Sequence, residues 1–439
     1  MKKRVVSLLA AVLCLTMIAG TVLTGCGSKG AQGTEPAASD AAAETAKADE
    51  EDKKVLTFYG FSDWVDTEPY KSTYLAVKEK FENENPGYEI ALQSDPWGDW
   101  EQKNKTMFAS GNAADVFYVG NDTFPTFANS GNLLNLDEYV QDGYYDDFFE
   151  NVLKMYTWEG KHEAIPFTTD CRILWYNKEI FEEAGLDPQA PPKTWDELRD
   201  AAKQITEKTG KYGFGMDLGL KEIPAQSLLC ASDYALLDVS DDGTIISNVT
   251  AQEFKDYLQL LSDMKDTFEP DYANLDHHDV AKQFAEGQFG MIIGNNLSET
   301  DIYEKDFWGQ ALVPTMTADA PQGSFGGGFG IGVNSETKYP EQAVKFAQML
   351  CDPEFNGALV SDIPASNKGA ANCDFAKDAK YATIMEQIQY VRQAQPKTLY
   401  FSEVQSAVYD TVANVVIGGE DIDDAVSTLD KQINEIVNQ

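Results

Sequence analysis

Val-Leu-Thr-Phe-Tyr-Gly-Phe-Ser-Asp-Trp, residues 55–64, begins the part of the chain whose pattern decides the fold. Its first five residues are rich in β-branched and aromatic side chains and predict a strand, and an acid beside an aromatic ring follows. Similar strand-and-loop patterns return at 88–100 and 116–122, with helical stretches at 73–83 and 100–110. This alternation predicts βαβ units and largely parallel sheets. In such sheets ligands bind at the carboxyl ends of the strands.

The rest of the chain continues this pattern up to residue 439. Further strands are expected at 173–176, 291–293 and 331–334, and helices at 195–207, 251–266, 341–350 and 422–437. Thr194 and Glu197 have the spacing of a capping box at the start of the second-lobe helix. Because residues 55–439 amount to about twice an ordinary domain, we expect an α/β protein with two lobes.

The N-terminus has the features of a secretory signal. Lys2, Lys3 and Arg4 precede an apolar run over 5–22, and Leu-Thr-Gly-Cys ends it at Cys26. This ending resembles the lipobox of bacterial lipoproteins, in which the cysteine becomes the lipidated N-terminus. We therefore expect a signal peptide over 1–25, a lipid (palmitate) anchor on Cys26 at the extracellular face of the cell membrane, and a disordered linker over 26–54. An ordinary signal peptide and an uncleaved anchor helix are the alternatives.

Charge and cysteine content exclude several classes of function. The chain carries a net charge of -38, and so acidic a surface repels nucleic acid and anionic lipid. Beyond the anchor, the cysteines are Cys171, Cys230, Cys351 and Cys373, with no CxxC pair. Their spacing predicts buried free thiols, with a single Cys351–Cys373 bridge as the alternative.

The sequence contains no complete motif for catalysis, metal binding or phosphate binding. The only three histidines include His277 and His278, and the run Asp-His-His-Asp at 276–279 is typical of a solvated helix start. The acidic loop 238–243 opens like a calcium site but has Val249 where a bidentate Glu is required. The glycines at 326–328 lack the spacing of a phosphate loop. We expect no enzyme activity, no cofactor and no metal.

Aromatic rings beside acids or amides recur in the predicted loops instead. Aromatic faces stack on the apolar faces of sugar rings, and carboxylates and amides accept hydroxyl protons. The alternative is that the rings are core residues and the acids ordinary surface. The clusters are Asp63 with Trp64, Trp97 with Asp99 and Trp100, Asn121 with Asp122, Asp170 with Arg172, and Asn295 with Asn296.

The run Ile-Pro-Phe-Thr-Thr-Asp-Cys-Arg-Ile-Leu-Trp-Tyr-Asn-Lys at 165–178 carries a family resemblance. With the stretches 179–186 and 192–198, it is similar to the extracellular solute-binding proteins of sugar ABC importers, the maltose-binding-like family 1. The runs 115–118, 130–133, 290–294 and 326–333 also match. The resemblance implies two lobes, 55–168 with 314–365 and 169–313 with 366–439, each a mainly parallel sheet flanked by helices and joined by crossing hinge strands. It implies a monomer that delivers its ligand to permease subunits.

The same resemblance implies a site between the lobes. Asp63, Asp122, Asp170 and Asn295 would bind hydroxyl groups, with Asn121 and Asn296 beside them, while Trp64 and Trp97 would stack on the sugar. The aromatic residue usual after Asn296 is absent, and Trp308 or Tyr400 would replace it. Arg172 would orient Asp170 or bind directly, and the backbone N–H groups of Gly327 and Gly328 would contact the ligand.

Two other functions use these same residues. A cationic solute such as a quaternary amine or polyamine would bind in an aromatic cage lined with acids. A surface glycoside hydrolase would need two carboxylates across the scissile bond, which Asp122 and Asp170 could supply.

Overall fold

The first sheet has the strand order β2-β1-β3-β15-β6. A computed structural model describes residues 53–218, 226–232, 234–239, 244–295, 300–392 and 398–438, with the backbone alone at 295, 300 and 301. The predicted signal peptide, Cys26 and the linker up to residue 52 lie outside the described residues. The strands of the first sheet are β1 (Lys54–Phe61), β2 (Tyr88–Asp95), β3 (Val116–Gly120), β6 (Ala164–Pro166) and β15 (Phe329–Val333).

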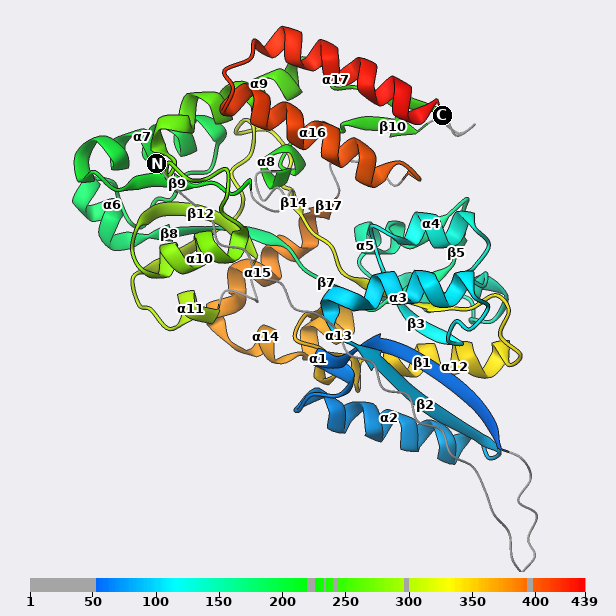
Figure 1. Cartoon of the computed structure of the whole chain (residues 1–439). Helices are drawn as coiled ribbons and strands as arrows, with labels where there is room; N and C mark the ends of the chain where they lie inside the picture. Colours follow the sequence, from blue (N-terminus) through cyan, green and yellow to red (C-terminus); the bar gives the residue numbers. More distant parts are fainter. Residues whose placement is uncertain are drawn as a thin grey trace, which may run out of the picture. The chain divides into compact units, whose positions relative to one another are not determined.

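The second sheet has the order β13-β8-β12-β9. Its strands are β8 (Arg172–Asn177), β9 (Tyr212–Gly215), β12 (Phe289–Asn295) and β13 (Trp308–Ala311). The two sheets with their flanking helices confirm the predicted α/β class (Figure 1).

Each sheet contains one strand that runs against all the others. In the first sheet β15 is antiparallel to β3 and β6, while β1 is parallel to β2 and β3. In the second sheet β8 is antiparallel to β12 and β13, while β12 is parallel to β9. Both reversed strands follow directly after a segment that passes from one sheet to the other. Because they enter from the edge at which the other strands end, they must run in the opposite direction.

Short ladders join the segments that pass between the sheets. β7 (Thr168–Thr169) pairs with β16 (Ile363–Pro364) in antiparallel fashion, and β14 (Ser324–Phe325) pairs in parallel with β17 (Val391–Arg392). We call these segments, 168–172, 324–328, 361–364 and 391–392, the crossing junction. Two further hairpins are peripheral: β4 (Thr157–Trp158) with β5 (Lys161–His162), and β10 (Leu237–Val239) with β11 (Ile245–Ser247).

Helices cover both sheets. Those near the first sheet are α1 (Ser62–Val65), α2 (Tyr70–Glu84), α3 (Trp97–Ala109), α4 (Phe124–Asn129), α5 (Glu150–Lys154) and α12 (Pro340–Leu350). Those near the second are α6 (Lys178–Ala184), α7 (Trp195–Thr209), α8 (Gln226–Cys230), α9 (Gln252–Met264), α10 (His277–Ala285), α11 (Thr300–Tyr303), α16 (Phe401–Val416) and α17 (Ile422–Val437). Between β16 and β17 lie α13 (Asn367–Asn372), α14 (Asp374–Lys377) and α15 (Ala382–Gln387).

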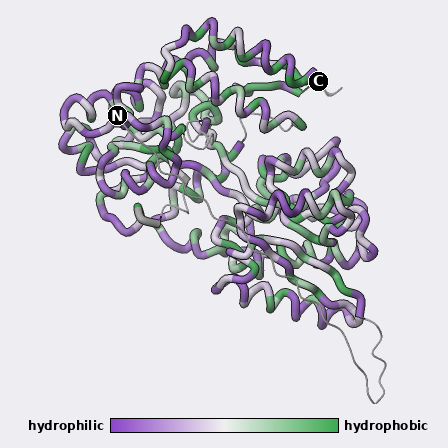
Figure 2. The backbone as a smooth tube through the Cα atoms, in the orientation of Figure 1, coloured by the Kyte–Doolittle hydropathy of each residue, from purple (hydrophilic) through white to green (hydrophobic). Residues whose placement is uncertain are grey.

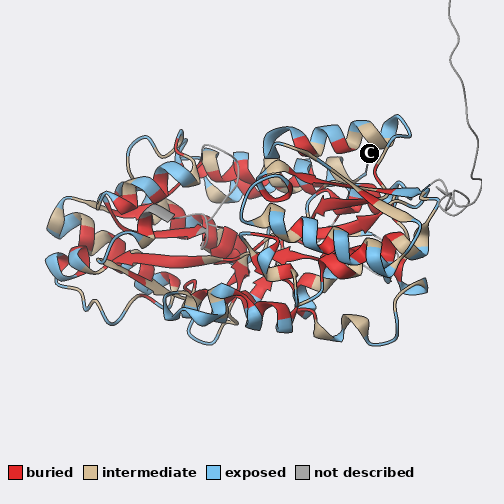
Figure 3. Cartoon of the chain, turned by 90° about the horizontal axis from the view of Figure 1, so that it is seen from below, coloured by how far each residue is buried: buried red, intermediate tan, exposed pale blue. Residues whose placement is uncertain are grey.

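The strands carry the core. Figure 2 shows hydrophobic residues along the strands, and Figure 3 shows these strands buried beneath helices whose outer faces are exposed. Along β8, Ile173 and Trp175 join a core that includes the first sheet, whereas Leu174 and Tyr176 join a second core under α7, α9 and α16. This two-residue alternation is that of a strand buried on both faces.

Several local predictions are confirmed. Cys171, Cys230, Cys351 and Cys373 are buried free thiols. Asp276 and Asp279 form a capping box at the start of α10, as expected of a helix start. Thr194 caps α7, although Glu197 accepts the N–H of Lys193 rather than that of Thr194. Among the described residues, no helix is long and apolar enough to cross a membrane.

Candidate functional site

Six aromatic side chains gather where β1, β2 and β3 end and β15 begins. They are Phe61, Trp64, Trp97, Trp100, Tyr118 and Phe329, and we call them the aromatic edge. Phe61 lies at its centre, with ring centroids 4.7 Å from Trp64, 5.1 Å from Trp97 and 5.1 Å from Trp100. The contacts are mostly edge-to-face, the arrangement favoured by aromatic quadrupoles. The cluster is therefore a packed aromatic core at the strand ends.

Within this edge, only Trp97 presents its ring openly to solvent. Trp97 is 57% exposed, whereas Trp64 is 6% exposed and donates its indole N–H to Ser361 Oγ at 3.1 Å. Trp97 is the first residue of α3, which begins directly after Pro96 and three residues earlier than expected. Proline lacks an N–H and is therefore tolerated at a helix start. Trp97 is available for stacking, while Trp64 has the core position that the alternative interpretation foresaw.

The polar residues that follow β3 lie beside the glycine run. The Asn121 backbone N–H donates to the carbonyl of Gly328 at 3.3 Å, and Asn121 Oδ1 lies 3.3 Å from where a Cβ on Gly327 would be. Asp122 Oδ1 accepts the N–H of Thr123 at 2.8 Å. The Asp122 side chain is accessible to solvent, yet the surrounding protein desolvates it and Glu101 repels it, so the pKa of its carboxyl is raised.

Asp170 is held by the crossing junction. Its Oδ1 accepts the N–H of Gly327 at 2.5 Å, and its Oδ2 accepts a hydrogen bond from Arg172 Nη1 at 2.8 Å. Arg172 lies in turn over the ring of Phe325, 5.1 Å from its centroid. The intervening Cys171 points the other way, into the core, where its thiol lies 3.9 Å from the carbonyl of Ile384. A small apolar side chain therefore fits in the core between two charged residues.

Residues 326–328 are glycines because their backbone packs directly against the backbone of 168–170. A Cβ on Gly326 would lie 2.3 Å from the carbonyl oxygen of Asp170, and one on Gly328 would lie 2.1 Å from that of Thr168. Gly328 also has φ +127°, which side chains rarely adopt. The N–H of Gly327 is donated to Asp170, so it does not point toward a ligand as we had expected. The glycine run therefore holds the Asp170 carboxylate in place through the Gly327 N–H.

Sequence reasoning missed Asp362, which lies in the crossing junction next to Ser361. Burial and the neighbouring charge of Asp170 raise the pKa of its carboxyl to about 7, and Arg172 offsets this in part. A lone acid between Ser361 and a short apolar strand carries no local signal of a site. Its place follows from the pairing of β16 with β7, which the sequence pattern did not predict.

The remaining predicted residues are more dispersed. Asp63 is exposed in α1. The backbone of Asn295 pairs with Arg172, its side chain is not described, and Asn296 lies outside the described residues. Trp308 pairs with Asn177 at the opposite end of β8 from Arg172 and packs on Trp175 at 5.6 Å. Tyr400 precedes α16 and packs against the second core.

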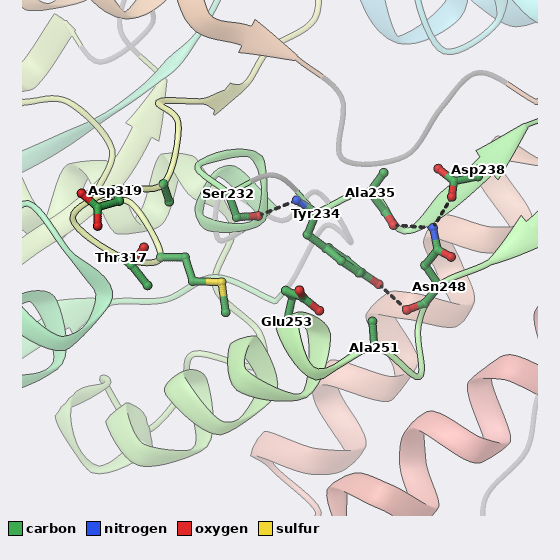
Figure 4. Close-up of a pocket in the computed structure, with 11 residues that line it drawn as sticks. Ser232, Tyr234, Ala235, Asp238, Asn248, Ala251, Glu253, Thr317 and Asp319 are labelled. Atoms are coloured by element: carbon green, nitrogen blue, oxygen red, sulfur yellow. Dashed lines mark hydrogen bonds between the residues drawn. The ribbon is translucent and has the colours of Figure 1, made fainter.

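A cavity of about 450 Å³ lies elsewhere, beside α9 (Figure 4). Tyr234 donates to the carbonyl of Asn248 at 3.1 Å, and the Asn248 amide donates to Asp238 at 3.0 Å. Asp319 lies across the cavity on a separate loop. None of the predicted site residues lines this cavity. Across the described part of the chain, no group of His, Cys, Asp or Glu side chains could hold a metal ion.

Comparison with known proteins gives consistent matches. The family model for bacterial extracellular solute-binding proteins matches residues 64–356. A protein of Brucella abortus is 28% identical over 318 residues, 70% of this chain and 75% of its own length. The diacetylchitobiose-binding protein DasA of Streptomyces coelicolor is 27% identical over 288 residues, 62% of this chain and 64% of its own length.

A solved structure extends the likeness to the whole fold. The sugar-binding protein MalE from Xanthomonas citri superposes with a TM-score of 0.76 and 22% identity, covering 88% of this chain and 98% of its own. This confirms the predicted two-lobed fold. The family model covers most of the chain, and the two sheets joined by crossing segments agree with it. The chain therefore belongs to the bacterial extracellular solute-binding protein family.

Proposed function

We propose that this protein is a lipid-anchored, extracellular substrate-binding protein of an ABC importer, which captures a carbohydrate and delivers it to the permease. The observation that carries the proposal is the approach of Asn121 and Asp170 to Gly327, two residues before Phe329, on which the open indole of Trp97 packs at 5.3 Å. Rings of this kind stack on sugar C–H faces, and the polar oxygens accept hydroxyl protons. The relatives' names, a diacetylchitobiose-binding and a sugar-binding protein, support the same ligand class.

Capture would proceed by hinge closure. The lobes would be 55–168 with 314–365 and 169–313 with 366–439, and the crossing junction would be their hinge. A ligand that contacts both lobes stabilises the closed form by its differential affinity for that form, which the permease then recognises. The lipid on Cys26 and the linker behind it would keep the protein at the membrane.

A saccharide panel tests the proposal. Glucose and the maltose, cellobiose and N,N′-diacetylchitobiose series up to six units are compared by thermal shift and titration calorimetry, with sn-glycerol 3-phosphate as the anionic contrast. We expect at least one neutral saccharide to bind and to raise the melting temperature by mass action. Trp97→Ala should weaken that binding. No binding across neutral saccharides of one to six units would refute the carbohydrate assignment.

A cationic solute is the second candidate. The observation in its favour is the crowding of Asp122 by Glu101 and of Asp362 by Asp170, which a cation would relieve. Choline and spermidine are therefore included in the panel. Binding of either cation in preference to every neutral saccharide at high salt would support this candidate instead.

A further inference from the structure

Asp362 and Asp170 lie next to the same end of the short ladder that joins two crossing segments. In the antiparallel ladder of β7 and β16, Ile363 pairs with Thr169 and Pro364 with Thr168. The ladder ends there, and Asp362 and Asp170 are the next residues of the two segments. Residues that follow the same end of a short antiparallel ladder are close in space. The charge of Asp170 accordingly acts on the Asp362 carboxyl, although the two residues come from distant parts of the chain.

The charges around this pair are unequal. Asp170 accepts hydrogen bonds from Arg172 and from the N–H of Gly327. The charged groups that act on Asp362 are Asp170 and Arg172. On the other side, its neighbour Ser361 meets the neutral indole of Trp64. Burial and the charge of Asp170 raise the pKa of Asp362 to about 7, so Asp362 takes up a proton near neutral pH.

Closure of the cleft between the lobes would further favour the protonated form of Asp362. Closure around a ligand expels water, and loss of water disfavours the charged form of a carboxyl that lacks its own cation. A protonated Asp362 can donate a hydrogen bond to a ligand hydroxyl and still accept one. We propose that Asp362 is a further ligand-binding residue of the cleft and that capture of a neutral polyol is coupled to uptake of a proton by the Asp170–Asp362 pair. This inference rests on the proposed function.

The pair is tested first without any ligand. In protein labelled with ¹³C at the Asp carboxyl carbons, the resonance missing from Asp362→Asn identifies Asp362. We expect its titration midpoint near pH 7, and a lower midpoint in Asp170→Asn, which removes the like charge. A midpoint near the ordinary value of about 4 would overturn the inference and leave the proposed function standing.

The coupling is tested by calorimetry from pH 5.5 to 8.5, in two buffers of different ionisation enthalpy. The probe is the neutral saccharide of the panel with the lowest Kd. We expect proton uptake on binding, and affinity that falls up to about tenfold per pH unit above pH 7. Asp362→Asn should bind without this pH dependence, and the control Asp319→Asn, in the remote cavity, should retain it.

Three outcomes would contradict the coupling. Affinity independent of pH in the wild type, or a dependence that survives in Asp362→Asn, would each overturn it. Tighter binding above pH 7 would mean that Asp362 acts as an anion. A midpoint near 7 with no saccharide bound would refute the proposed function and the coupling with it, while leaving the carboxyl pair itself established.

Discussion

The aromatic edge and the crossing junction meet at the same place but are built differently. The edge consists of side chains at the ends of successive strands, and its energy comes from ring contacts such as those of Phe61. The junction joins residues as far apart as Asp170 and Gly327, 157 positions along the chain, and depends on backbone contact and paired charges. The edge offers a ligand an apolar surface, and the junction supplies charge where the lobes would hinge.

The largest effect is expected from the junction. Gly328→Ala places a Cβ 2.1 Å from the carbonyl oxygen of Thr168 at φ +127°. We expect the free energy of unfolding to fall by about 3 kcal/mol, from overpacking and backbone strain together. Urea denaturation measures it. Gly98→Ala is the control, because no atom lies within 4 Å of its Cβ position, and it should change stability by less than about 1 kcal/mol. Equal losses in the free energy of unfolding of both variants would show that the close contact between Gly328 and Thr168 is not needed for stability.

Asp362→Asn separates charge from packing at the junction. The folded protein raises the pKa of Asp362 to about 7, so it binds more protons than the unfolded chain between pH 4 and 7. The free energy of unfolding of the wild type should therefore fall as pH rises through this window. Asp362→Asn has no titrating carboxyl at this position and should not show this fall. We expect the variant to gain about 3 kcal/mol over the wild type between pH 4 and pH 7. Melting temperatures across that range measure the gain, and a constant difference would contradict it.

Trp97→Ala tests whether the aromatic edge binds ligand. Since the ring is 57% exposed, we expect the melting temperature without ligand to change little. Affinity for the panel saccharide should fall about tenfold, equivalent to 1.4 kcal/mol. Trp308→Ala is the matched contrast: it removes a ring packed on Trp175 and should lower stability while affinity stays unchanged. If Trp308→Ala weakened binding and Trp97→Ala did not, the binding surface would lie at the other end of β8.

The smallest effect is expected at Asp122. Asp122→Asn keeps one oxygen acceptor and loses the charge, so saccharide affinity should fall about threefold, the value of part of one hydrogen bond. Calorimetry resolves this difference. Glu101→Gln, which relieves the repulsion on Asp122 without removing its carboxylate, should not weaken saccharide binding. Loss of affinity in Glu101→Gln alone would place the contact at Glu101.

Much of the aromatic edge could be predicted from the sequence because its signals are local. Strand periodicity predicted β1, β2 and β3 to within a few residues, and the loops after them hold Trp97, Asn121 and Asp122. Local pattern could not separate Trp97 from Trp64, since both follow a strand and sit beside an acid. Their difference, an open ring against a buried one, depends on Ser361 and Phe167, which contact Trp64 from far along the chain.

The crossing junction could be predicted only in part. Asp170 and Arg172 were singled out as one of the recurring polar clusters, and their place at a crossover came from a family resemblance. The glycines were expected to contact ligand rather than another backbone. Asp362 escaped notice because its partner, Asp170, is set by a two-residue ladder. Pairings this short carry no periodicity, and their register is fixed by tertiary contacts alone.

A crystal structure of the protein with the best-bound panel saccharide tests the central claim most directly. The account predicts a sugar ring stacked on Trp97, with hydroxyl groups within hydrogen-bonding distance of Asp122, Asp170 and Asp362. A saccharide seated elsewhere, for example in the cavity lined by Tyr234 and Asp319, would contradict it.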